Sequence, residues 1–327
     1  MHSGHTLHLV AWLLFALAPG CRNTSSDAPA PEQVALRVAL LLPDTPDDHG
    51  WSQAGYQGLK RIERELGAEV VYTPSVTADA AEPIIRDYAR AGFDFVVGHG
   101  GEYIPSMEKV APEFPQARFA VVGSYPGNNF NLGALSFRDG ELGYLCGAVA
   151  ALRSASGKVA FIGGVPYPHM KEQAVLFERG AKATKPSVSV EVHWLGSWYD
   201  EGKAASIARM LIRRGFDVLL ADADAAGVGV FREAKAAGVH AIGWAVDQNH
   251  LAPESVVTSG IQRVDVLLLN GARLVEQGRW EGKQYKFGLR EGAQSLAPFR
   301  GLLSDDDAAT VQRVEADILA GRVEVTP

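Results

Sequence analysis

Short apolar runs alternate with segments of helical periodicity along most of the chain, and this alternation is the strongest constraint on its fold. The first apolar run, residues 38–42, is continuous and ends at Pro43. The next segment, residues 53–66, carries apolar side chains at helical spacing and stops at Gly67, a residue that favours a helix C-terminus. A continuous apolar run of this length is typical of a parallel strand buried on both faces. The sequence therefore predicts an α/β fold of parallel sheets flanked by helices.

The alternation occurs in two successive series, which predicts two similar lobes. The first series continues with expected strands at 70–72, 93–97 and 119–122, and with expected helices at 83–91, 105–114 and 140–152. Residues 132–137 lead into the last of these helices. The second series has expected strands at 159–162, 188–194, 218–220 and 241–243, and expected helices at 171–183, 202–214 and 227–237. A chain of 327 residues is long enough for two cores. Ligands of open α/β sheets bind beyond the carboxyl ends of the strands, so the loops there are the candidate site.

The N-terminal segment predicts targeting and not a folded element. Residues 7–18 are apolar apart from His8, a run shorter than the ~20 residues that span a bilayer. Small residues then precede Cys21, and this pattern resembles the lipobox of bacterial lipoproteins. We expect residues 1–20 to be a lipoprotein signal peptide, Cys21 to carry the lipid, and residues 21–36 to form a flexible tether. A plain secretory signal and an apolar N-terminal helix are the alternatives. The expected location is the extracytoplasmic face of a membrane in the cell envelope.

Composition and missing motifs exclude several classes of function. The chain has 31 Lys and Arg against 38 Asp and Glu, and this net negative charge argues against a nucleic-acid partner. Two cysteines exclude a disulfide scaffold, and Cys146 lies in an apolar stretch typical of a buried thiol. No Gly-x-Ser-x-Gly elbow or complete phosphate-binding loop occurs. His99 and Glu102 could form an acid–base pair, but a role at the rim of a cleft or in a turn is the favoured interpretation. We expect no enzyme activity, no cofactor and no metal.

Five segments together resemble the basic membrane protein (Bmp) family, the purine-nucleoside-receptor type of ABC-transporter substrate-binding lipoprotein. They are residues 48–53 (Asp-His-Gly-Trp-Ser-Gln), 137–143, 196–200, 224–230 and 241–248. The resemblance covers the chain from about residue 38 to the C-terminus. It implies a two-lobed type I periplasmic-binding-protein fold, with the ligand in the interlobe cleft and an ABC permease as partner. The implied lobes are 37–137 plus 248–283, and 138–247 plus 284–327.

Two tryptophans are candidates for stacking on a flat ligand. Trp51 follows the first strand, where the family usually has Phe, and Trp198 follows the strand at 188–194 in the second lobe. A base stacked on an aromatic side chain gains ~1–3 kcal/mol, so two rings from two lobes would couple binding to closure. Packing of Trp51 in the core is the alternative.

Polar candidates follow other strands. Asp224 lies beyond the strand at 218–220, where a carboxylate could accept hydrogen bonds from an amino group and a ring N–H. Its alternative role is to cap the following helix, and Asp222 competes for either role. The remaining candidate ligand-binding residues are Ser52, Tyr125, Asp247 and His49, although His49 could equally be a solvated turn residue.

Departures from the family pattern affect the sugar side of the expected site. The family's Gly-Val-Asp-Ser-Asp-Gln is here Gly-Trp-Ala-Val-Asp-Gln, so the ribose-binding Asp is replaced by Ala245. The family's Lys is replaced by Gln262, and Trp244 would fill space near the ribose. The resemblance is nearest to the nucleobase (adenine)-binding branch, and we expect a purine base or related heterocycle as ligand. A purine nucleoside is one alternative, and a sensor that feeds a membrane kinase is another.

Overall fold

The computed structural model describes residues 35–47 and 51–326. The expected signal peptide, the lipidation site Cys21, most of the tether and the candidate ligand residue His49 therefore lie outside the described residues. In the described part of the chain, no helix is both long and apolar enough to cross a bilayer.

The first sheet has the strand order β11-β5-β4-β3-β1-β2, and all its neighbouring strands pair in parallel. Its strands are β1 (Arg37–Leu41), β2 (Glu69–Thr73), β3 (Phe95–Gly98), β4 (Arg118–Val122), β5 (Leu132–Phe137) and β11 (Gln284–Phe287). Its helices are α1 (Trp51–Leu66), α2 (Ala81–Arg90), α3 (Ile104–Val110) and α8 (Val264–Glu276), with short 3-10 turns η1 (Gly101–Tyr103) and η2 (Ala111–Glu113). Alternate residues of β1 serve opposite cores: Val38 and Leu40 pack with α1 and α8, whereas Ala39 and Leu41 pack with α2 and α3.

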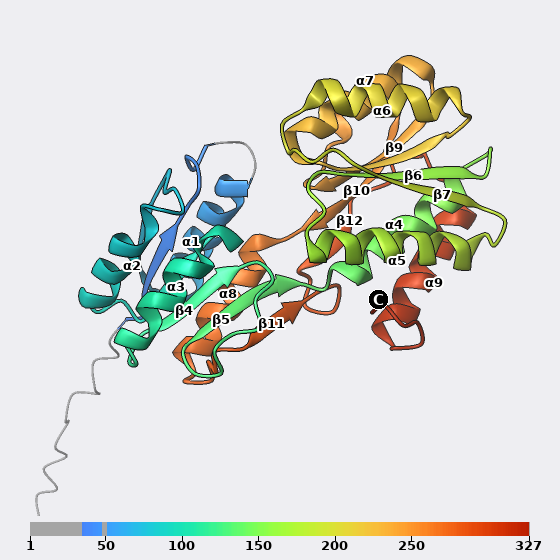
Figure 1. Cartoon of the computed structure of the whole chain (residues 1–327). Coiled ribbons are helices and arrows are strands. Elements are labelled where there is room, and N and C mark those ends of the chain that lie inside the picture. Colours follow the sequence, from blue (N-terminus) through green and yellow to red (C-terminus); the bar gives the residue numbers. More distant parts are fainter. Residues whose placement is uncertain (1–34, 48–50, 327) are drawn as a thin grey trace, which may run out of the picture. The chain divides into compact units, whose positions relative to one another are not determined.

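The second sheet has the order β12-β10-β9-β8-β6-β7, parallel except for β12, which pairs antiparallel with β10. Its strands are β6 (Lys158–Gly163), β7 (Ser189–Trp194), β8 (Val218–Asp222), β9 (His240–Ala245), β10 (Val256–Gln262) and β12 (Gln294–Leu296). Helices α4 (Asp139–Arg153), α5 (Pro168–Thr184) and α9 (Asp305–Leu319) cover one face, and α6 (Glu201–Arg213) and α7 (Gly227–Ala237) cover the other (Figure 1). Short turns η3 (Asp224–Ala226) and η4 (Asn249–Leu251) follow β8 and β9.

Glycines bring helices α4 and α5 into backbone contact. A Cβ added to Gly147 would lie 2.0 Å from the carbonyl oxygen of Phe177, and one added to Gly180 would lie 2.0 Å from that of Tyr144. Only residues without a side chain permit this approach. The contact explains why α4, which begins directly after the first sheet ends, is buried along nearly its whole length.

The structure confirms the predicted α/β fold, with two sheets made mainly of parallel strands. Two strands, however, lie in the opposite lobe to the one expected. Strand β10 falls in the range 248–283 expected for the first lobe, yet it pairs with β9 of the second sheet. Strand β11, expected in the second lobe, pairs with β5 of the first sheet. The chain thus passes between sheets near Arg138, Arg263 and Gly288. The apolar pattern of a strand reports burial and not the identity of the neighbouring strand, so the sequence did not reveal these pairings.

Candidate functional site

The expected ligand-binding residues follow the carboxyl ends of strands in both sheets. In the first sheet, Trp51 begins the helix after β1 and Tyr125 follows β4. In the second sheet, Trp198 follows β7, Asp224 follows β8 and Asp247 follows β9. In a parallel sheet these ends share one edge, which is where open α/β folds bind ligands.

Trp51 is held in one orientation by His99, which lies just after β3. The two rings stack with centroids 4.2 Å apart and planes 13° apart. The indole Nε1–H donates to the His99 carbonyl oxygen at 3.1 Å, and His99 Nε2 lies 2.7 Å from the Trp51 carbonyl oxygen. His99 is fully buried, and Gly55 leaves room for its ring, since a Cβ there would lie 2.6 Å from Cδ2. His99 therefore supports one face of the half-buried indole, a role that the sequence did not indicate.

Ser52 and Tyr125 serve local structure through their hydroxyl groups. The buried Ser52 Oγ accepts a hydrogen bond from the backbone N–H of Asp44 at 3.0 Å, which ties the β1–α1 loop to the helix. The Tyr125 hydroxyl donates to Glu108 Oε1 at 3.0 Å. Burial and the Glu108 carboxylate raise the pKa of Tyr125 to about 12. Tyr125 is therefore a neutral phenol at physiological pH.

Trp198 is the point at which three loops of the second sheet meet. Its carbonyl oxygen accepts from the N–H of Ala226 in the loop after β8, at 2.9 Å. Its ring lies against Gly164 after β6, where an added Cβ would be 2.3 Å from Cε3. The N–H of Gly164 in turn donates to the Asp222 carbonyl oxygen at 2.9 Å, and the Tyr167 ring lies 6.5 Å from the indole. The half-buried indole is thus fixed at the carboxyl edge of this sheet.

The two candidate aspartates at the end of β8 and in the loop after it lie in contrasting surroundings. Asp222 is the last residue of β8 and 5% exposed, and its Oδ2 has no hydrogen-bond partner among the described residues. Asp224 is exposed and adopts a φ of 48°, a left-handed conformation that Asp tolerates better than most residues. The N-cap of α7 is Ala226, and no side chain caps it, so the alternative capping role of Asp224 is wrong. Asp222 is the more sequestered carboxyl group.

The segment after β9 divides into a buried and an exposed part. Trp244 is 5% exposed and belongs to the core between the second sheet and α4, with its ring against Gly260. Its backbone N–H donates to Gln248 Oε1 at 2.9 Å. Asp247 instead forms an ion pair with Arg300 near the surface.

Gln262, which stands in place of the family's lysine, binds a buried carboxyl group. Its Nε2 donates to Asp139 Oδ1 at 3.3 Å, and Gln173 Nε2 donates to the same oxygen at 2.9 Å. Burial raises the pKa of Asp139 to about 7, and Glu172 adds to this while Lys286 opposes it. An acidic residue at the start of an apolar helix was the sequence signal for Asp139, and the prediction did not use it.

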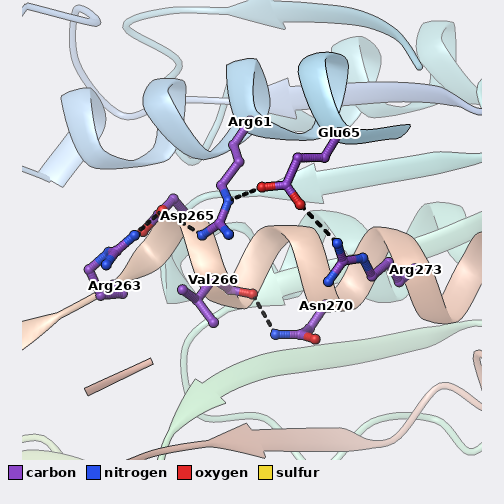
Figure 2. A network of polar contacts seen from close by, with 7 residues as sticks. All are labelled: Arg61, Glu65, Arg263, Asp265, Val266, Asn270 and Arg273. Carbon is purple, nitrogen blue, oxygen red and sulfur yellow. Dashed lines mark hydrogen bonds and ion pairs between the residues drawn. The ribbon is translucent and has the colours of Figure 1, made fainter. Parts of the chain in front are cut away.

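A polar network joins α1 to α8 in the first lobe (Figure 2). Asp265 accepts from Arg61 at 2.8 Å and from Arg263 at 2.7 Å, while Glu65 accepts from Arg61 at 2.7 Å and from Arg273 at 2.8 Å. A depression of about 330 Å³ lies beside this network, and none of the expected ligand-binding residues lines it. The network fastens α8, which begins directly after the second passage between sheets, to the first lobe.

No group of three or more His, Cys, Asp or Glu side chains within the described ranges could hold a metal ion. Cys146 is a fully buried free thiol whose pKa is raised by burial. Its burial agrees with the prediction for this residue.

The two parallel-dominated sheets, with the chain passing between them three times, define a two-lobed type I periplasmic-binding fold. A solved ABC-transporter solute-binding protein from Aeropyrum pernix superposes with a TM-score of 0.75 at 22% identity, over 89% of this chain and 94% of that one. A transcriptional activator of the comK gene from Bacillus halodurans superposes with a TM-score of 0.76 at 26% identity, over 87% of this chain and 98% of that one.

The chain belongs to the Bmp family, described as PnrA-like ABC transporter substrate-binding proteins, which it matches over residues 35–326. A purine-binding protein of Brucella abortus is 30% identical over 291 residues, which are 88% of this chain and 82% of that protein. The family confirms the sequence-based expectation of a binding protein that is not an enzyme. Such proteins bind small-molecule ligands outside the cytoplasm and interact with an ABC permease.

Proposed function

We propose that this chain captures a free purine base, adenine-like in its hydrogen-bonding pattern, for uptake by an ABC permease. The relative from Brucella abortus is named a purine-binding protein, which supports purines as the ligand class. The two departures from the family's sugar-binding pattern, Ala245 and Gln262, favour a base over a nucleoside.

The observation that carries this preference is the engagement of Gln262 with Asp139. The Gln262 side-chain amide is neutral, and it already donates a hydrogen bond to Oδ1 of the buried Asp139 carboxyl group. It therefore does not offer a sugar the charged donor that the family's lysine would provide. Ala245 offers only a methyl group where the family has a carboxylate. A site that binds hydroxyl groups gains its selectivity from such polar partners, and these two residues do not supply them.

Trp51 and Trp198 are proposed to stack on the two faces of the base. Each is half-buried and is fixed by its neighbours, Trp51 by the His99 ring and Trp198 by close contact with Gly164. Fixed rings lose little conformational entropy on binding, so most of the ~1–3 kcal/mol of stacking would appear as affinity.

Calorimetry with adenine, guanine, adenosine and guanosine tests the proposal. We expect adenine to bind more tightly than adenosine, because the sugar would lie against Ala245 and Gln262. If adenosine binds ten times more tightly than either base, a preference of about 1.4 kcal/mol, the chain is a nucleoside receptor instead.

A sensor function is the second candidate, and the similarity to a protein named as a transcriptional activator favours it. A sensor would report ligand to a membrane kinase without delivering it. Uptake of labelled adenine in cells that lack this chain separates the two functions: lost uptake supports transport, whereas normal uptake with an altered transcriptional response to adenine supports the sensor.

A further inference from the structure

Asp222 is a buried carboxyl group at the end of a strand, and no contact within the described chain explains why it is there. It ends β8, so its backbone lies at the carboxyl edge of the second sheet. Its side chain is nearly fully buried, and Oδ2 has no hydrogen-bond partner among the described residues. Buried polar atoms without a partner are rare in native proteins because removing them from water without a new hydrogen bond is unfavourable, and they call for an explanation such as a ligand.

The charged surroundings of Asp222 favour its neutral form. The charges that act on it come from Asp139 at the start of α4 and Asp224 in the loop after β8, and both are acidic. The Cys146 thiol on α4 also lies within electrostatic range of Asp222, which adds to the rise in the pKa of that thiol. The Lys286 ammonium group and Glu172 act on Asp139. Burial and the two neighbouring aspartates therefore raise the pKa of Asp222 well above its usual range.

The backbone of Asp222 is hydrogen-bonded to the residue against which the Trp198 ring packs, and we propose that ring as one half of the base sandwich. Its carbonyl oxygen accepts from Gly164 N–H at 2.9 Å, and Gly164 is the residue against which the Trp198 ring packs. At the carboxyl edge of the second sheet, Gly164 thus connects the backbone of Asp222, whose buried carboxyl group has an unused acceptor atom, to the Trp198 ring.

We propose that Asp222, as a neutral carboxylic acid, forms two hydrogen bonds to one edge of the ligand. Its O–H group donates one of them and its carbonyl oxygen accepts the other. This inference rests on the proposed purine-binding function. A neutral acid offers one O–H donor and one carbonyl acceptor, whereas a carboxylate offers acceptors only. Adenine presents a ring nitrogen acceptor beside an amino donor, which matches the neutral acid. Guanine presents a ring N–H beside an amino group, two donors that match a carboxylate. The protonation state of Asp222 thereby selects the adenine-like edge.

Two substitutions separate hydrogen bonding from charge at this position. Asp222→Asn keeps one donor and one acceptor without an ionisable group, so it should bind adenine within threefold of wild type at pH 6 and keep that affinity up to pH 9. Asp222→Leu removes both, and adenine affinity should fall tenfold or more. Asp87→Asn, at a carboxylate that is 77% exposed and is not among the expected ligand-binding residues, is the control, and we expect it to leave adenine affinity within twofold. Circular dichroism melts verify that each variant is folded.

The wild-type protein supplies the complementary measurement. Its adenine affinity should decrease, and its guanine affinity increase, as the pH rises through the ionisation of Asp222. In the ligand-free protein, carbon-13 NMR of the aspartate carboxyl groups should show Asp222 neutral at pH 7, by comparison with Asp222→Asn. An ionised Asp222 at pH 7 overturns the inference, as does adenine affinity unchanged in a folded Asp222→Leu. Failure of wild type to bind any purine or nucleoside instead overturns the proposed function itself.

Discussion

Gln262 at the end of β10 donates a hydrogen bond to Asp139 at the start of α4, with Nε2 and Oδ1 3.3 Å apart. Each residue lies directly beside one of the passages of the chain between the two sheets. The bond therefore joins two connecting segments that are more than a hundred residues apart in sequence. A second donor, Gln173 on α5, completes the surroundings of this oxygen.

The burial of Asp139 should make stability fall as pH rises. Its pKa is raised from 3.8 to about 7, chiefly by burial, so between those values the folded protein retains a proton that the unfolded chain has lost. Stability then decreases with pH by up to about 1.4 kcal/mol per unit for one such proton. Asp139→Asn removes this dependence, so the variant should gain stability relative to wild type between pH 4 and pH 8. Denaturant unfolding at several pH values measures it.

The control for this measurement is Asp87→Asn, at a carboxylate whose side chain is 77% exposed. The difference in free energy of unfolding between Asp87→Asn and wild type should be nearly constant over the same pH range. A parallel shift of the Asp139→Asn and wild-type curves would contradict the prediction.

Restoring the family's sugar-side residues should recover nucleoside binding. Ala245 adopts a left-handed φ of 68°, a conformation that Asp tolerates better than Ala, so Ala245→Asp introduces no new backbone strain. Gln262→Lys places an ammonium group beside Asp139 and lowers the pKa of that carboxyl group. In the double variant, the ratio of adenosine to adenine affinity should rise at least tenfold by calorimetry. An unchanged ratio, with both single variants folded, would refute the assignment of these positions to the sugar side.

Filling the space at Gly164 should displace Trp198 and weaken ligand binding. A methyl group there would lie 2.3 Å from the indole ring, so Gly164→Ala forces the ring to move. Affinity should fall by up to the full stacking contribution of ~1–3 kcal/mol. The control, Gly202→Ala in the first turn of α6, meets only Asp200 Oδ1 at 3.6 Å and should leave affinity unchanged. A lower melting temperature with intact affinity in Gly164→Ala would indicate that Trp198 only packs the fold.

Removal of Asp265 should loosen the attachment of α8 to α1. Its carboxylate accepts from both Arg61 and Arg263 and is 20% exposed, so Asp265→Asn leaves two guanidinium groups close together (Figure 2). We expect a loss of about 1–2 kcal/mol of stability in denaturant unfolding, smaller at high salt. Glu281→Gln breaks an ion pair whose carboxylate is 62% exposed, and it should lower stability much less than Asp265→Asn does. Equal effects of the two substitutions would argue against a structural role for the network.

Cys21 is expected to carry lipid, and the two cysteines of the chain provide an internal control. Metabolic labelling with a fatty acid should label the wild-type protein and not Cys21→Ser. The thiol of Cys146 is fully buried, so Cys146→Ala should be labelled like wild type. Equal labelling of Cys21→Ser and wild type would rule out the anchor.

The sequence was sufficient to locate most helices and strands, because their burial leaves a local apolar pattern. The run at 38–42 indicated β1, and the glycine after residue 66 marked the end of α1. The strand ends also indicated where to search for the site, since parallel strands place their carboxyl ends at one edge.

Tertiary structure decided the features that depend on neighbours distant in sequence. Strand pairing, and not composition, placed β10 in the second sheet and β11 in the first. Asp222 and Asp224 are separated by one residue, and the sequence left both as candidates for either role. Asp222 is buried because it ends a strand covered on both faces, whereas Asp224 lies in the loop beyond and is exposed. The support of Trp51 by His99 and the bond from Gln262 to Asp139 likewise join separate segments. Local sequence determines the elements because their periodicity is local, whereas burial and partners of single side chains arise only when the sheets assemble.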